Sequence, residues 1–191
     1  MEVQKIDYKN IYYPPGGILL WILITLELIT FGVTLIVLVV HSKEDPALFH
    51  QSRLELNTTF GAINTIFLLS SGAFMAVTVH QFKENNLKKA AGYLKLTMLG
   101  GVLFLFLKGF EYSLKIESGH ILGSNSFFTF YWLLTGFHVI HVLVGLVILL
   151  FALNGLKKEK TILEDLEASA AFWHMCDLIW LLLFPVLYLI L

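Results

Sequence analysis

Charged residues are scarce in this sequence. Only 14% of its 191 residues are Asp, Glu, Lys or Arg, against about 25% in an ordinary soluble domain. So few charges cannot cover the surface of a water-soluble globule. The formal net charge of −1 gives no electrostatic reason to expect a nucleic-acid partner. The shortage of charge therefore excludes a typical soluble domain and a basic nucleic-acid-binding surface.

Cysteine is nearly missing too. Cys176 is the single cysteine, so an intrachain disulfide framework and a CxxC metal site are excluded. It lies in an apolar run, where a cysteine is usually a small buried thiol. The sequence also has no nucleotide-binding glycine loop. We therefore expect no catalytic residue, and no haem or metal bound by this chain.

Apolar residues are abundant. They make up 57% of the chain and fall into five runs, each near the roughly 20 residues that a membrane-spanning helix needs. None alternates with the period of two expected of a barrel strand. The runs are 17–40, 59–80, 91–112, 127–153 and 170–191. The sequence therefore predicts an all-α, polytopic membrane bundle of five transmembrane helices.

The segments between the runs are short and polar. They are 41–58, 81–90, 113–126 and 154–169. None is long enough for a separate domain, so we expect one five-helix domain, 17–191, after an N-terminal segment, 1–16. The first run is longer than a signal-peptide core, and no small-residue cleavage site follows it, so we expect the span to be retained.

Lysine and arginine are unevenly shared between the two sides of the predicted bundle. One side would hold Lys5, Lys9, Lys83, Lys88, Lys89, Lys157, Lys158 and Lys160. The other would hold Lys43, Arg53 and Lys115. Because basic connectors stay in the cytoplasm, this asymmetry predicts a cytoplasmic segment 1–16 and an external C-terminus.

Ionisable residues inside the runs need partners, because a charge at the bilayer centre costs about 2.5–3.5 kcal/mol on insertion scales. They include Glu27, Lys108, Glu111, His138, His141, His174 and Asp177. Three helices carry such residues three apart, hence on one face. The pattern predicts a polar network inside the bundle, which could hydrogen-bond across helices and influence local proton availability.

Each pair also has a purely structural interpretation. We expect His174 and Asp177 to hydrogen-bond within their helix and tie it to its neighbours. Lys108 and Glu111 are expected to form an ion pair at the membrane boundary, with the lysine side chain extending outward.

Glu27 has no basic residue near it in sequence. It lies about 15–20 Å into its helix, and so do His138 and His141. We therefore expect its carboxyl to lie within hydrogen-bond reach of one of these histidines. Polar packing is the favoured role of both histidines. Opposite axial haem ligands must come from facing helices, so two histidines three apart suit one haem poorly.

Four motifs follow one another along the chain. The first run contains W-x-x-x-x-x-E-L-x-x-F-G, with the carboxylate at Glu27. The second opens N-T-x-x-L-L-x-S-G, and the third closes with E-Y. The fourth contains T-G-F-H-x-x-H-V-x-x-G, and E-A-x-x-x-x-W-H-x-x-D-x-x-W begins before the fifth. Motif positions include Asn64, Ser71, Gly72, His80, Tyr112, Gly136, Glu167, Trp173 and Trp180.

Together these motifs resemble cytochrome c oxidase subunit III, in a short five-helix bacterial form. The resemblance implies a non-catalytic subunit of a haem-copper terminal oxidase in aerobic respiration, in the plasma membrane of a prokaryote. It would pack on subunit I, which carries the haem and copper, stabilise that subunit and support proton uptake during oxygen reduction. Bound phospholipid is also implied. The family-type polar positions would be Glu27, Glu111, His138, His141, Glu167, His174 and Asp177.

Two departures from the family stand out. Longer members have seven helices, and the two N-terminal ones, which wall a lipid cleft, have no counterpart among the five runs. A lipid cleft would therefore need a neighbouring subunit to complete it. Lys108 occupies a position that is usually polar but uncharged.

Three alternatives remain open. An accessory subunit of a nitric oxide reductase shares the fold and most motifs. A dihaem membrane cytochrome b would need facing ligand pairs among His80, His138, His141 and His174. A small proton-coupled transporter would use Glu27 as its proton-carrying group.

Overall fold

The computed structural model describes residues 16–191. Its elements are α1 (Ile18–Ser42), α2 (Pro46–Leu54), α3 (Thr58–Lys83), α4 (Leu87–Glu117), α5 (Ser126–Lys157), α6 (Leu163–Pro185) and a π-helical turn, η1 (Val186–Ile190). The described residues contain no strand. Five helices have the length and composition to cross a membrane, which confirms the predicted all-α polytopic fold. The expected cytoplasmic segment lies, apart from Gly16, outside the described residues.

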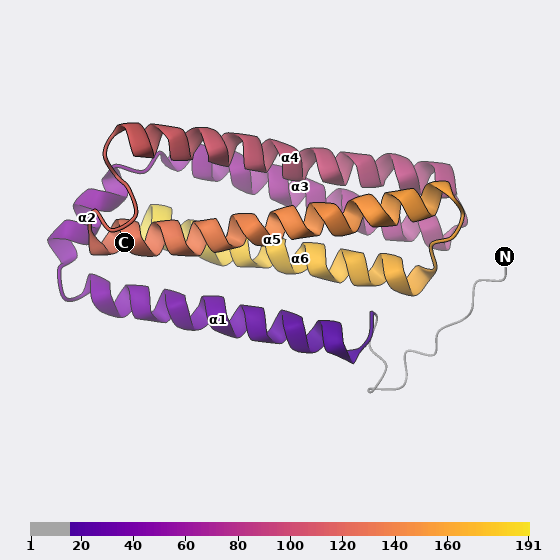
Figure 1. Cartoon of the computed structure of the whole chain (residues 1–191), viewed down its shortest axis with the longest axis horizontal. Helices are drawn as coiled ribbons and strands as arrows, with labels where there is room; N and C mark the ends of the chain where they lie inside the picture. Colours follow the sequence, from indigo (N-terminus) through magenta and orange to yellow (C-terminus); the bar gives the residue numbers. More distant parts are fainter. Residues whose placement is uncertain (1–15) are drawn as a thin grey trace.

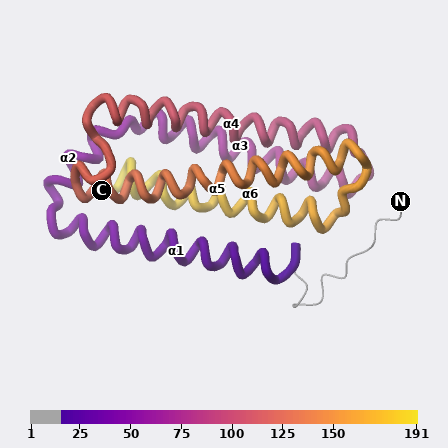
Figure 2. Tube along the Cα trace, viewed as in Figure 1, coloured from indigo at the N-terminus to yellow at the C-terminus, as the bar shows by residue number. Residues whose placement is uncertain are grey.

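The long helices run side by side in alternating directions (Figure 1). Helices α3 and α4 form a hairpin, α5 and α6 lie beside it, and α1 runs along the opposite side of the α5–α6 pair (Figures 1 and 2). The short helix α2 joins α1 to α3 at one end, here named the α2 end. The other end carries Lys83, Lys88, Lys89, Lys157, Lys158 and Lys160 and is named the lysine-rich end.

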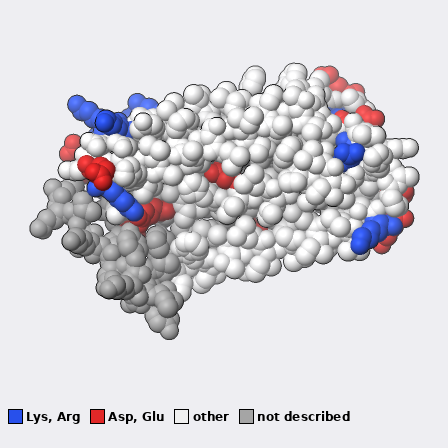
Figure 3. Space-filling model, turned by 180° about the vertical axis from the view of Figure 1, so that it is seen from behind, with Lys and Arg blue, Asp and Glu red and all other residues white. Residues whose placement is uncertain are grey.

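Charge is distributed as a membrane protein requires. On the face shown in Figure 3, Lys, Arg, Asp and Glu gather mostly at the two ends, and the broad band between them is white apart from a few red atoms. Exposed side chains along the helices are mostly Leu, Ile, Val and Phe. The chain is therefore a multi-pass membrane protein, whereas the side that each end faces stays a prediction.

Two helix starts differ from the sequence expectation. Helix α2 lies inside the 41–58 connector, where the sequence predicts no helix because the segment is short and not apolar. The Asp45 side chain caps it by accepting a hydrogen bond from the backbone N–H of Leu48 at 3.1 Å. Helix α6 begins at Leu163 rather than at residue 170, and its first turn contains Glu164 and Asp165. Acidic residues suit a helix N-terminus, so the helix continues beyond its apolar part.

Helix α6 is central and α1 is peripheral. The ring of Trp173 in α6 lies against two glycines: a Cβ on Gly101 of α4 would be 2.6 Å from it, and one on Gly145 of α5 would be 2.9 Å from it. Bare backbone at these positions lets three helices pack around one tryptophan. In α1, by contrast, only Ile24, Phe31, Leu35 and Leu38 are buried, so most of that helix faces outward.

Candidate functional site: polar clusters inside the bundle

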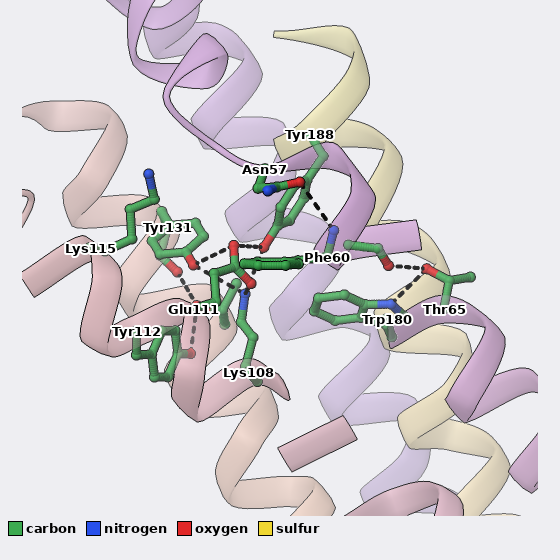
Figure 4. A network of polar contacts seen from close by, with 12 residues as sticks. Asn57, Phe60, Thr65, Lys108, Glu111, Tyr112, Lys115, Tyr131, Trp180 and Tyr188 are labelled. Atoms are coloured by element: carbon green, nitrogen blue, oxygen red, sulfur yellow. Dashed lines mark hydrogen bonds and ion pairs between the residues drawn. The ribbon is translucent and has the colours of Figure 1, made fainter. Parts of the chain in front are cut away.

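The largest polar cluster surrounds Lys108 on α4. Its Nζ lies 3.0 Å from Glu111 Oε2, and both side chains are almost completely buried. The Nζ also donates to the hydroxyls of Tyr131, at 3.1 Å, and Tyr188, at 2.7 Å (Figure 4). The expected outward extension of this lysine is therefore wrong. Lys108 lies nine residues before the end of α4, about 13 Å along the axis, and its partners hold it inside.

Every charged group in this cluster has several partners. Both tyrosine hydroxyls also donate to Glu111 Oε1, Tyr131 at 3.1 Å and Tyr188 at 2.7 Å. The ammonium lies 4.8–5.3 Å from four aromatic ring centroids, an arrangement that attracts a cation to the ring faces. These rings are Tyr112, Tyr131, Trp180 and Tyr188. A buried ion pair stabilises only when its remaining hydrogen-bonding capacity is filled, and here it joins α4, α5 and η1.

Further contacts secure the α2 end of the bundle. Tyr112 donates to Thr135 Oγ1 at 2.8 Å, and Lys115 donates to the backbone carbonyl of Glu55. Arg53 of α2 donates to the carbonyl of Leu189 at 3.4 Å. These bonds connect α2, α4, α5 and η1, so we infer a fastening role for the whole cluster.

Glu27 forms a second, smaller cluster where α1 meets α5. Its Oε2 lies 3.3 Å from Nε2 of His141, with the two side chains 19% and 12% exposed. The structure thus places Glu27 beside one of the two histidines expected there, although it is half-buried rather than enclosed. The contact meets the distance for an ion pair but not the geometry of a hydrogen bond, since Oε2 has no hydrogen-bond partner within residues 16–191.

The second nitrogen of His141 defines what this pair can do. Its Nδ1 lies 2.8 Å from the carbonyl oxygen of Phe137. A carbonyl only accepts, so this nitrogen carries a hydrogen, and Nε2 is left facing the carboxyl. The Nε2 nitrogen of His141 and the carboxyl of Glu27 therefore face each other where α1 meets α5.

His138 has a different environment. Its ring stacks on Trp180 with centroids 5.5 Å apart and meets Phe104 edge-on at 5.5 Å. It is fully buried, and neither ring nitrogen has a hydrogen-bond partner in the described part of the chain. The two histidines lie about one turn apart on α5 but have different surroundings. His141 contacts the carboxyl of Glu27, and His138 packs among aromatic rings.

His174 and Asp177 lie together on α6, as expected from their spacing. Nδ1 of His174 is 3.4 Å from Oδ2 of Asp177. The carboxylate packs directly on Gly72 of α3, where a Cβ would collide with it. Gly72 thus allows α3 and α6 to approach closely around a polar side chain. His174 keeps 43% of its side chain exposed, and Asp177 keeps 8%.

The two tryptophans of the last motif connect α6 to α3. Trp173 donates to Ser71 Oγ at 3.0 Å, and Ser71 in turn donates to the carbonyl of Thr97 at 2.7 Å. Trp180 donates to Thr65 Oγ1 at 2.9 Å. A buried indole N–H needs such a partner, so both tryptophans pack inside rather than at the boundary.

The remaining motif positions are more scattered. Glu167 pairs with Lys83 at 2.7 Å near the lysine-rich end. Asn64 is fully buried, and neither atom of its amide group has a partner among residues 16–191. His80 is exposed near the end of α3, and a Cβ on Gly136 would meet nothing within 4 Å.

Tyr131, Thr135 and Tyr188 belong to the Lys108 cluster but were not expected there. Tyrosines near the ends of apolar runs are typical of membrane boundaries, and nothing in the sequence shows that two of them point inward. The sequence does give one indication that Lys108 is buried, namely how far it lies from the end of its helix.

Across residues 16–191, no three His, Cys, Asp or Glu side chains come together as a metal-binding group.

Fold and clusters together define a class of protein: a polytopic helical membrane protein whose helices are joined by buried polar pairs. A model of the cytochrome c oxidase subunit III family matches residues 55–190, so the chain belongs to that family. This confirms the resemblance drawn from the four motifs.

Curated relatives named cytochrome c oxidase subunit 3 agree. The relative from Rhipicephalus sanguineus is 37% identical over 132 residues, covering 66% of this chain and 49% of its own length. The relative from Drosophila melanogaster is 34% identical over 131 residues, covering 66% and 48%, and that from Schizophyllum commune is 37% identical over 129, covering 65% and 47%. The chain spans about half the length of these relatives.

Proposed function

We propose that this chain is the non-catalytic subunit III of a haem-copper terminal oxidase in aerobic respiration. It packs on subunit I, stabilises it and supports proton uptake while oxygen is reduced. The observation that carries the proposal is the family match over residues 55–190. The haem and copper are assigned to the partner subunit, and phospholipid is the expected further ligand.

The Glu27–His141 pair supports the proton-uptake part of the proposal. A carboxyl and an imidazole 3.3 Å apart can hold one proton between them inside an otherwise apolar span. The rest of α1 is apolar apart from its hydroxyl side chains and its last turn. The packing of the helix therefore gives no other reason for a carboxylate at position 27. The pair would keep a proton available near the partner subunit.

The exposed face of α1 supports packing on a partner. Its outward side chains are large and apolar, and they include Leu19, Leu26, Val33 and Ile36. Because α1 contributes so little to the core of the chain itself, we expect α1, together with α3, to contact subunit I. We place the complex in the plasma membrane of a prokaryote, an expectation drawn from the motif resemblance; the relatives named above are eukaryotic.

Purification in mild detergent tests this function. The tagged full-length chain should co-purify with a large subunit, and the complex should show a Soret band and contain iron and copper. Iron and copper should stay with the large subunit when the two are separated. A complex lacking copper but containing haem and non-haem iron would instead indicate a nitric oxide reductase. Stoichiometric iron or copper in the isolated chain would contradict the proposal.

A further inference from the structure

Helix α6 is enclosed on every side but one. Its exposed and half-exposed side chains recur at intervals of three and four residues, so they form one stripe along the helix. We name this stripe the open stripe of α6. It consists of Ala171, His174, Leu178, Leu181, Leu182 and Pro185.

The open stripe lies between α3 and α1. On one side, α3 contacts α6 through the Lys83–Glu167 ion pair and through Gly72 beneath Asp177. On the other side, α1 packs against α6, and a Cβ on Gly16 would lie 2.8 Å from the side chain of Ala168. Figures 1 and 2 show α3 and α1 on opposite sides of the α5–α6 pair. The stripe is therefore bordered by α3 along one edge and by α1 along the other.

His174 is out of place on a surface that faces lipid. It lies seven residues beyond Glu167, which pairs with Lys83 at the lysine-rich end, about 10 Å further along the axis, and 43% of its side chain is exposed. Its Nδ1 contacts Asp177, whereas its Nε2 has no hydrogen bond to any described residue. Lipid chains offer no hydrogen-bonding group at this depth, and polar side chains in membrane spans normally face protein or water.

Asp177 anchors the ring of His174 beside the open stripe. Its side chain is 92% buried, because only 8% of it is exposed. One carboxylate oxygen contacts His174, and the other, Oδ1, has no partner within residues 16–191. Because Oδ1 is itself buried, the hydrogen-bonding capacity left open on the stripe is that of Nε2 of His174, which Asp177 holds in place through Nδ1.

We propose that a transmembrane helix of a partner subunit occupies the open stripe of α6 and pairs its own hydrogen-bonding side chain with His174. The inference rests on the proposed function, since it supposes that the chain works inside a complex. Small residues fit a closely packed helix there: Ala171 lies on the stripe, and Ala73 and Ala76 are exposed on the adjoining α3. The leucines of the stripe supply its apolar contact.

Site-specific photo-crosslinking in the intact complex locates the partner. A photoreactive amino acid replaces Leu178 or Leu182 on the stripe, and matched controls replace Phe106 of α4 or Phe151 of α5, which are 76% and 72% exposed. The stripe positions should crosslink to another polypeptide, and the control positions should not. Protein adducts only from Phe106 and Phe151, or only lipid adducts from Leu178 and Leu182, would overturn the inference while leaving subunit membership intact.

Substitution of His174 tests the polar contact. Interhelical hydrogen bonds in membranes are worth about 0.6–1.7 kcal/mol, so His174→Leu should weaken the association of the chain with the complex about three- to eighteenfold. His174→Gln should restore most of the retention. Equal retention of H174L and the parent chain would overturn the polar pairing. Failure of the parent chain to co-purify with any subunit would instead contradict the proposed function.

Discussion

Two acid–base pairs in the bundle, Lys108–Glu111 and Glu27–His141, differ in almost every respect. Lys108 and Glu111 lie on one helix, are almost fully buried, and are hydrogen-bonded to two tyrosines. Glu27 and His141 lie on two helices, are partly exposed, and share one contact at 3.3 Å. In the first pair the ammonium donates to three partners, and these bonds fasten α4, α5 and η1 together. The second makes a single contact between α1 and α5, and under the proposed function it is the pair that exchanges a proton.

The largest expected effect is the loss of one partner from the enclosed pair. Glu111→Ala leaves the Lys108 ammonium buried without its carboxylate, and breaking a buried pair in this way costs about 3–5 kcal/mol. We expect the variant to unfold or to be lost from the membrane. The readout is the denaturation midpoint in detergent and the amount of chain that accumulates.

A double variant checks the cause. Lys108→Met combined with Glu111→Leu removes both charges, and well-packed apolar replacements of a buried pair are often neutral. This variant should be markedly more stable than Glu111→Ala alone. If both variants are equally unstable, the cost is one of shape rather than of the unpaired charge.

Packing around Trp173 gives a smaller effect. Gly101→Ala would place a Cβ 2.6 Å from the indole, and overpacking of this kind costs about 1–3 kcal/mol. Gly92→Ala on the same helix is the matched control, because a Cβ there would meet nothing within 4 Å. Thermal unfolding should separate the two variants. Equal midpoints would show that the bundle adjusts to the added methyl group.

Glu27 should respond differently to removal and to neutralisation. Glu27→Ala removes a contact between α1 and α5 and should cost about 1–2 kcal/mol of helix association, near the upper range for polar contacts in membranes. Glu27→Gln keeps a hydrogen-bonding side chain and should assemble normally. The fraction of chain recovered in the complex measures the difference. Loss of assembly in Glu27→Gln would mean that the charge itself is needed for packing.

The smallest expected effect comes from one hydroxyl of the enclosed cluster. Tyr188→Phe removes bonds to Lys108 and Glu111 but keeps the ring, and Tyr131 still bonds both charged groups, so we expect a loss of about 0.5–1.5 kcal/mol. Tyr93→Phe serves as the control, since the Tyr93 ring stacks on Phe74 outside the cluster. Unchanged stability of Tyr188→Phe would show that η1 is held by its apolar contacts alone.

The sequence determines some of these features more directly than others. Five apolar runs predict five helices, because membrane spans need length and hydrophobicity whatever their neighbours are. Depth along the helix also placed Glu27 near His141. Neither the apolar runs nor the depth along a helix locates α2. Its start depends on the side-chain cap at Asp45 and on its contacts with other helices.

The Lys108 cluster could not be derived in the same way. Its partners Tyr131 and Tyr188 are 23 and 80 residues away in sequence, and only the packing of α4, α5 and η1 turns them inward. A lysine and a glutamate three apart have the same spacing at a membrane boundary and in a core. The distance of the lysine from the end of its helix distinguishes a boundary pair from a core pair.

Oxygen consumption by the assembled complex, measured over a range of pH in Glu27→Gln and Tyr188→Phe, tests the contrast between the two pairs most directly. The account predicts that Glu27→Gln assembles fully but turns over more slowly, most of all at alkaline pH, where protons are scarce. Tyr188→Phe should lose stability but keep the parental turnover per assembled complex. Parental turnover of Glu27→Gln at every pH, or slowed turnover of fully assembled Tyr188→Phe, would contradict the assignment of proton exchange to Glu27 and fastening to Lys108.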